Sequence, residues 1–211
     1  MIKVENAKVY NIARAIYSAR NAMNSWDKSD SDLDNDILGA NDLDLAKRLY
    51  KASLDGNNAH RKYLRQIFVS MDITAPLYWW KEADTYKVGT VTNSCSTMHK
   101  IHAKEFTLDD FSHEHLIASA GKHGGTLDIL DNVIAELNYW RERYLKTNNK
   151  DHWWQMIQLL PTSYNQRRTV TMNYENVVTI IKQRSGHKLD EWNIFVECLK
   201  ELPYIREIMG E

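Results

Sequence analysis

The 211-residue sequence contains little cysteine or proline, no long hydrophobic run and almost no net charge. Two cysteines exclude a disulfide framework and favour a reducing compartment, so we expect a cytoplasmic protein. Three prolines and eight glycines leave little room for long linkers, which predicts one domain over residues 1–211. No apolar run approaches membrane length, and the first ten residues are too polar for a signal peptide. A net charge of −1 supplies no field that would recruit nucleic acid.

The sequence also lacks the short motifs of self-sufficient catalytic sites. It has no nucleophile elbow, no GxxxxGK[ST] phosphate loop, no GxGxxG and no HExxH. The triplet His113, Glu114 and His115 comes nearest to a metal cluster, but neighbouring side chains on a helix point apart. We therefore predict no metal site, and no catalytic side chain is identified.

Helical spacing of apolar residues dominates what is present. It predicts helices over residues 8–23, 42–54, 76–87, 108–115, 126–147, 151–160, 173–184 and 189–202. Alternating Ile67, Val69, Met71 and Ile73 predict a half-buried strand over 64–74. Residues 24–41 form an acidic loop or lid in this interpretation, and residues 88–99 form a polar loop. Mostly helix with a small sheet indicates an α+β fold.

Two polar side chains mark the segment near the C-terminus. Asn173 and Arg184 are eleven residues apart, close to three helical turns, which predicts that both leave the same side of one helix about 16 Å apart. They could grip one large ligand or two neighbouring ligands. The alternative is a surface amide and a surface guanidinium on an ordinary amphipathic helix.

Other polar groups leave the same choice open. Gly89 permits close backbone approach, and the hydroxyl-rich residues after it could bind phosphate or form a plain polar loop. His60 precedes the predicted strand and could face a ligand or solvent. The pairs Trp79–Trp80 and Trp153–Trp154 could stack on a ligand or belong to the core or a subunit interface.

The sequence resembles the flavin-dependent thymidylate synthases. The residues that carry the resemblance are Leu160-Pro161, Asn173 and Arg184 at the family's intervals, Ala75-Pro76 after a strand, and Asn93 and Ser96 at the spacing of the family's RHRxxSxNxxSxR signature. Ala19-Arg20 also matches a dipeptide near the family's N-terminus. The resemblance implies a small antiparallel sheet packed against several helices, and homotetramers with shared active sites.

The resemblance also implies a chemistry. Family members transfer a one-carbon unit from methylenetetrahydrofolate to dUMP, with reduced FAD supplying hydride and NADPH as a co-substrate. It places Asn93, Asn173, Lys87 and His60 at the cofactor, and Arg184 and Ser96 at the pyrimidine nucleotide. An arginine suits the nucleotide phosphate because its fork can donate two parallel hydrogen bonds.

Several signature positions carry other residues. With Asn93 as reference, Tyr86, Lys87 and Val88 occupy the Arg-His-Arg positions, and Met98 occupies that of the last arginine. Counting from Pro76 without a gap shifts this register by one. Each lost charge-assisted contact is worth about 1.5–3 kcal/mol, so two or three would weaken binding by about three to six powers of ten. The hypotheses are therefore a thymidylate-synthase-like flavoenzyme acting on a pyrimidine deoxynucleotide, a non-catalytic nucleotide- or protein-binding member of the fold, and an accidental similarity.

Overall fold

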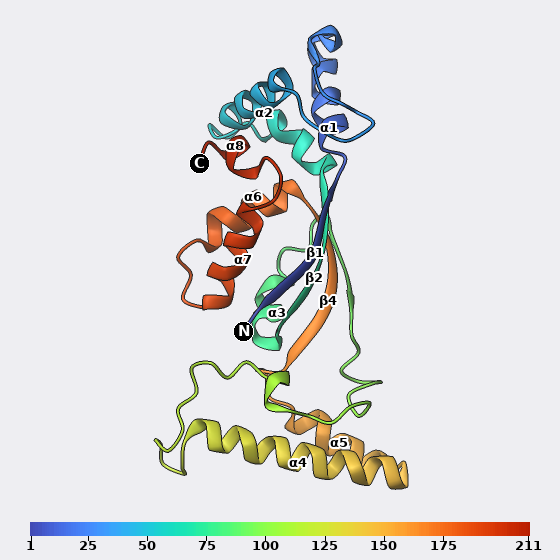
Figure 1. Ribbon diagram of the computed structural model, residues 1–211, viewed down its shortest axis with the longest axis vertical. Coiled ribbons are helices and arrows are strands. Elements are labelled where there is room, and N and C mark those ends of the chain that lie inside the picture. Colours follow the sequence, from blue (N-terminus) through green and yellow to red (C-terminus); the bar gives the residue numbers. More distant parts are fainter. The chain divides into compact units, whose positions relative to one another are not determined.

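The computed structural model describes residues 1–211 and has an α+β fold (Figure 1). Four strands form one antiparallel sheet in the order β1-β2-β4-β3. The strands are β1 (Lys3–Tyr10), β2 (Phe68–Pro76), β3 (Thr90–Ser94) and β4 (Asn165–Asn173). The α-helices are α1 (Ile12–Ala19), α2 (Ala40–Ala52), α3 (Leu77–Ala83), α4 (Thr126–Thr147), α5 (Lys150–Leu159), α6 (Tyr174–Arg184), α7 (Asp190–Lys200) and α8 (Ile205–Met209). Short 3₁₀ helices span Arg20–Met23, Trp26–Lys28, Asn58–Gln66 and Leu108–Asp110. This architecture confirms the predicted fold class.

The chain divides into two compact units. The first comprises residues 1–3, 73–85 and 93–168, and the second comprises residues 4–72, 86–92 and 169–211. All four strands therefore contribute residues to both units. No helix is long and apolar enough to cross a membrane.

The first unit is built on the antiparallel pair α4 and α5, which lie side by side in Figure 1. Leu130 and Leu137 on α4 and Met156 on α5 are buried together with Phe106 and Phe111 from the preceding segment. The predicted bounds of α4 are confirmed, and α5 begins one residue early because Asn149 caps it through a side-chain bond to the Asp151 N–H. This core orders the irregular segment between β3 and α4.

The second unit contains α1, α2, α6, α7 and α8, whereas α3 belongs to the first unit. Helices α6 and α7 pack against each other, and α2 packs against both α1 and α8. The buried face of α6 consists of Tyr174, Val177, Val178, Ile180 and Ile181, as its predicted apolar stripe requires. Helix α8 follows Pro203 and was not predicted, because only five residues form it.

The acidic segment 24–41 is more ordered than predicted. Asp30 accepts backbone N–H bonds at the start of α2, and Asp42 forms a 2.6 Å ion pair with Arg20 while accepting bonds from two serine hydroxyls of the segment. Leu38 is buried, whereas Leu33 and Ile37 are exposed. Polar bonds to α2, rather than apolar anchors, therefore hold most of this segment.

Three strands differ from the predictions. The predicted loop over 88–99 contains β3, and the start of the predicted helix 8–23 belongs to β1. Both are edge strands with mainly exposed side chains, so neither has the buried face that produces apolar alternation. Strand β4 was not predicted. Its buried side chains Gln166, Val170 and Met172 do lie on one face, but Gln166 and Arg168 on that face are polar, so the sequence shows no apolar alternation.

Other predicted bounds shift by local effects. The helix after Ala75 begins at Leu77 with Pro76 in an extended conformation, and it ends before Asp84. The first residues of the predicted strand over 64–74 form a 3₁₀ turn, and the strand begins at Phe68. The predicted helix over 108–115 is one 3₁₀ turn, with the predicted Thr107 as its cap.

Candidate functional site

The candidate site begins at the junction of β4 and α6 in the second unit. Asn173 is the last residue of β4 and the N-cap of α6, and its Oδ1 accepts the N–H of Asn176 at 3.0 Å. The residue is 8% exposed. The cap fixes the orientation of the amide, because an N-cap must present its oxygen to the helix. The Nδ2 group is consequently the part of Asn173 that faces away from the helix bond.

The segment 88–90 lies against this amide. Gly89 has φ +72°, and a Cβ built there would lie 2.3 Å from Asn173 Nδ2. Asn176 fixes the segment by donating from Nδ2 to the Val88 carbonyl at 2.6 Å and to Thr90 Oγ1 at 2.8 Å. The predicted close approach at Gly89 is therefore present, and what the glycine approaches is the Asn173 side chain. A larger residue at position 89 would collide with Nδ2.

Arg184 occupies the opposite end of α6 among aromatic rings. Its Nε donates to Tyr86 Oη at 2.9 Å, and its Nη1 lies 3.1 Å from His187 Nε2. The guanidinium carbon lies 4.5 Å from the centre of the Trp192 ring and 5.5 Å from that of Tyr86. The cation–π contacts and the hydrogen bond to the Tyr86 hydroxyl hold the guanidinium in one orientation. Tyr86 Oη in turn donates to Gln183 Oε1 at 2.9 Å.

Two further predicted positions lie in the second unit. Lys87 is exposed and sits between Tyr86 and Val88, both of which bond to residues of α6. His60 is exposed, and its Nε2 lies 3.1 Å from Asn57 Nδ2. The Tyr86–Thr90 segment therefore places Lys87 near α6, whereas the structure shows His60 in a local contact of its own 3₁₀ turn.

The first unit contains Asn93 and Ser96. Asn93 is an exposed residue of β3. Ser96 Oγ accepts the backbone N–H groups of Met98 and His99 at 3.2 and 2.9 Å, which leaves its hydroxyl proton to donate. Ser96 also lines a pocket of about 240 Å³ with Tyr164 and Gln166 among its walls.

The polar walls of this pocket are held by bonds within the first unit. Gln166 donates to the Cys95 carbonyl at 2.6 Å, and Asn165 accepts from the Ser112 hydroxyl at 2.9 Å. Burial raises the pKa of the Tyr164 phenol above its ordinary value, so this group is a neutral hydroxyl at physiological pH. The pocket can therefore offer neutral donors and acceptors from Ser96, Tyr164 and the neighbouring β4 residues.

Solved structures share this architecture over the full length of the chain. Two crystal structures of the flavin-dependent thymidylate synthase ThyX of Helicobacter pylori, complexed with FAD and dUMP, align with TM-scores of 0.69 at 14% identity. They cover 99% and 100% of this chain and 98% of the other chain. The chain has the flavin-dependent thymidylate synthase fold. The resemblance seen in the sequence is confirmed at the level of the fold.

A second enzyme with this flavin-dependent thymidylate synthase-like fold is also similar. The UMP/dUMP methylase PolB of Streptomyces cacaoi, bound with 5-Br dUMP, aligns with a TM-score of 0.63 at 15% identity. The alignment covers 100% of this chain and 95% of PolB. No protein-family model matches the sequence, and no curated protein matches it.

Some residues of the site were not predicted from the sequence. Asn176, His187 and Trp192 order the two ends of α6, and none of them belongs to the resemblance. Tyr86 was noted only as a departure from an arginine position. Trp192 lies on α7, across a turn from Arg184 at the end of α6. The spacing of the two residues therefore gave no signal that they are in contact. The flavin-dependent thymidylate synthase fold is thus combined here with contacts that the resemblance did not predict.

Proposed function

We propose that this protein is a flavin-dependent enzyme that transfers a one-carbon unit to a pyrimidine deoxynucleotide, dUMP or a relative. The observation that carries the proposal is α6, which presents the Asn173 amide at one end and an oriented Arg184 guanidinium at the other. The fold supports it, because similar chains of this fold were crystallised with FAD and dUMP or with 5-Br dUMP.

FAD is the proposed cofactor, and the Asn173 end of α6 fits it. The helix cap uses Asn173 Oδ1, so Nδ2 is the donor that a carbonyl of a flat cofactor could accept from. Lys87 from the same segment, His60 and Asn93 are the further proposed cofactor contacts. When bound in its reduced form, FAD would supply hydride, which no side chain can. The role of the chain's own residues is to bind and orient.

The nucleotide is assigned to Arg184 and Ser96. A guanidinium can bond phosphate oxygens through two N–H groups at once, and the Tyr86 and Trp192 contacts reduce the entropy lost when it does so. Ser96 would donate its hydroxyl proton, since its oxygen already accepts two backbone N–H groups. NADPH and methylenetetrahydrofolate are the proposed co-substrates, and a homotetramer in the cytoplasm is the proposed state.

A second function has its own support. Tyr86, Val88 and Met98 supply no charge at positions where the resembling family carries arginines, and Arg184 already bonds Tyr86 and His187. These features favour a non-catalytic protein of the same fold that binds a nucleotide or a protein partner. The two functions differ in whether the chain takes up flavin.

The test is the absorbance spectrum of the purified protein before and after addition of FAD, followed by titration with dUMP in a calorimeter. The proposal expects an oxidised-flavin band that remains after gel filtration, and saturable dUMP binding. A colourless protein that retains no added FAD would contradict the flavoenzyme and leave the binding protein. A monomeric mass in solution would contradict a site shared between subunits.

Arg184→Gln tests the nucleotide role directly. We expect dUMP affinity to fall by about tenfold to a hundredfold, the value of a charge-assisted hydrogen bond. Arg143→Gln is the matched control, because Arg143 also donates to a tyrosine hydroxyl, at 2.5 Å, and lies over the ring of that Tyr139, but on the surface of α4. Equal dUMP affinity in the Arg184 variant and the native protein would refute the assignment.

A further inference from the structure

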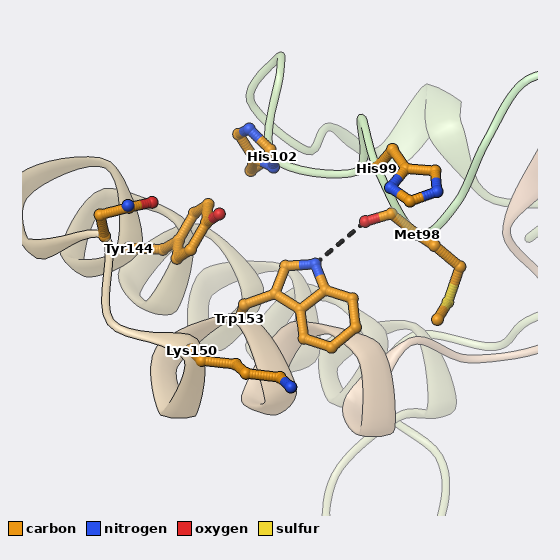
Figure 2. Close-up of a pocket in the computed structure, with 7 residues that line it drawn as sticks. Met98, His99, His102, Tyr144, Lys150 and Trp153 are labelled. Carbon is orange, nitrogen blue, oxygen red and sulfur yellow. Dashed lines mark hydrogen bonds between the residues drawn. The ribbon is translucent and has the colours of Figure 1, made fainter.

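A separate pocket lies in the first unit between α4, α5 and the segment 98–102. Its volume is about 350 Å³, within the range of small-ligand sites. Figure 2 shows the segment's Met98, His99 and His102 on one side and Tyr144, Lys150 and Trp153 on the other. Asn148 completes the lining. None of these residues belongs to the proposed flavin and nucleotide contacts.

Hydrogen bonds and ring contacts hold the walls of the pocket. Trp153 Nε1 donates to the Met98 carbonyl at 3.0 Å, which ties the segment to α5 (Figure 2). Arg141 Nε donates to the His102 carbonyl at 3.0 Å, which ties it to α4. The His102 ring meets the Tyr144 ring edge to face, with centres 4.8 Å apart. The pocket is therefore formed before any ligand enters.

The charge that lines the pocket is positive. Lys150 is a cation, the rings of His99 and His102 each carry a nitrogen that can donate a hydrogen bond, and no acidic side chain lines the pocket. His102 Nδ1 is buried and has no hydrogen-bond partner within the chain. Buried polar atoms are nearly always paired, so this unpaired atom is a polar feature of the wall that His102 forms. The lining favours an anion over a cation or a neutral polar group.

The aromatic residues narrow the ligand further. Trp153 and Tyr144 are half-buried and lie on adjoining helices at the edge of the same space. The parts of these rings that remain uncovered provide apolar contact area for a flat ring, and they lose little entropy on binding because they are held in place. A small inorganic anion would use only the charged part of the lining.

We propose that this pocket binds a planar aromatic anion, a ring that carries a phosphate or carboxylate group. The ring packs against Trp153 and Tyr144, and the anionic group meets Lys150 and the two histidines. Phenyl phosphate contains both parts and is the probe. Inorganic phosphate tests the charge alone, and benzamide tests the ring alone.

The experiment follows the tryptophan indole and histidine ring signals of the full chain by NMR during titration with each probe. The proposal expects saturable shifts with phenyl phosphate and at least about tenfold weaker binding of the other two probes, the value of one charge-assisted contact. No saturation with phenyl phosphate at millimolar concentration would overturn the proposal. So would equal affinity for phenyl phosphate and inorganic phosphate.

Two pairs of variants locate the binding. Lys150→Gln should weaken phenyl phosphate binding by roughly tenfold, whereas Lys146→Gln, an exposed lysine near the end of α4 that does not line the pocket, should leave it unchanged. Trp153→Phe should weaken binding by several-fold, and Trp154→Phe should not. Equal losses in both members of either pair would overturn the assignment to this pocket. The native-protein titration decides the proposal even if Trp153→Phe fails to fold.

Discussion

Replacing Gly89 by alanine tests the contact at the start of α6. The new Cβ would lie 2.3 Å from Asn173 Nδ2, closer than any stable contact permits. The colliding atom is the end of a side chain, so relief comes by rotation of the amide. Rotation removes Oδ1 from the Asn176 N–H, and α6 loses its N-cap. The substitution therefore has a backbone effect and a side-chain effect.

The two effects have separate magnitudes. An alanine at φ +72° costs about 1–2 kcal/mol of folding free energy, because Cβ approaches the carbonyl in the left-handed region. Loss of an asparagine N-cap costs about 1 kcal/mol. We expect Gly89→Ala to lower the free energy of unfolding by about 2–3 kcal/mol, in sum.

Gly186 supplies the matched control. It has the same φ of +72°, but a Cβ there would meet nothing within 4 Å. Gly186→Ala should therefore show the backbone cost alone, about 1–2 kcal/mol. Urea unfolding of both variants, read by circular dichroism, measures the difference, which should be about 1 kcal/mol and should appear in the midpoint without a change of slope.

A double-mutant cycle isolates the collision. In an Asn173→Ala background there is no amide to displace, so adding Gly89→Ala should cost no more than Gly186→Ala does. The coupling between positions 89 and 173 should then be about 1 kcal/mol. Equal costs of Gly89→Ala in the native and Asn173→Ala backgrounds would refute the contact on which the proposed cofactor position depends.

Three further predictions concern stability elsewhere, each measured by urea unfolding. Leu137→Ala in the core of the first unit should cost about 2–5 kcal/mol, whereas Leu145→Ala on the same helix, where the residue is 54% exposed, should change stability by about 0.5 kcal/mol or less. Asp42→Ala should cost about 3–5 kcal/mol because it leaves the Arg20 guanidinium, 5% exposed, without its ion-pair partner. Backbone N–H groups at the start of α2 hold the pKa of Asp30 below its ordinary value. The contribution of Asp30 to folding stability is therefore present above about pH 4 and is lost as the pH falls further. Asp30→Asn should reduce the difference in stability between about pH 6 and about pH 3.

The sequence predicted the elements that bury a continuous face. The bounds of α4 matched, and the alternating residues Ile67, Val69, Met71 and Ile73 of the predicted strand are all buried. These elements have an apolar period because one side meets the core. Strands β1 and β3 lie at the edges of the sheet, where exposure removes the pattern, and Asn6 at φ +54° further interrupts β1. The small sheet was predicted, but its edge strands form by hydrogen bonding to the neighbouring strands, and the local sequence does not indicate that pairing.

The candidate site was predicted in part for a similar reason. Asn173 and Arg184 follow from a spacing along one helix, and the structure places them at its two ends. The prediction that both leave one side of the helix was imprecise, because Asn173 is the cap residue and its side chain turns back to the Asn176 N–H. Tyr86 lies nearly a hundred residues from Arg184 in the sequence, and its contact arises from the fold alone.

Three of the proposed site residues, each considered by itself, present donors to a ligand. Asn173 uses Oδ1 for the helix cap, which leaves the Nδ2 donor. Ser96 uses its oxygen for two backbone N–H groups, which leaves the hydroxyl proton. Arg184 has only donors. These residues therefore complement a ligand rich in acceptors, such as the carbonyls of a flavin or the phosphate and carbonyl oxygens of a nucleotide. A cationic ligand would meet like charge at Arg184, which favours the nucleotide over a basic partner for both proposed functions.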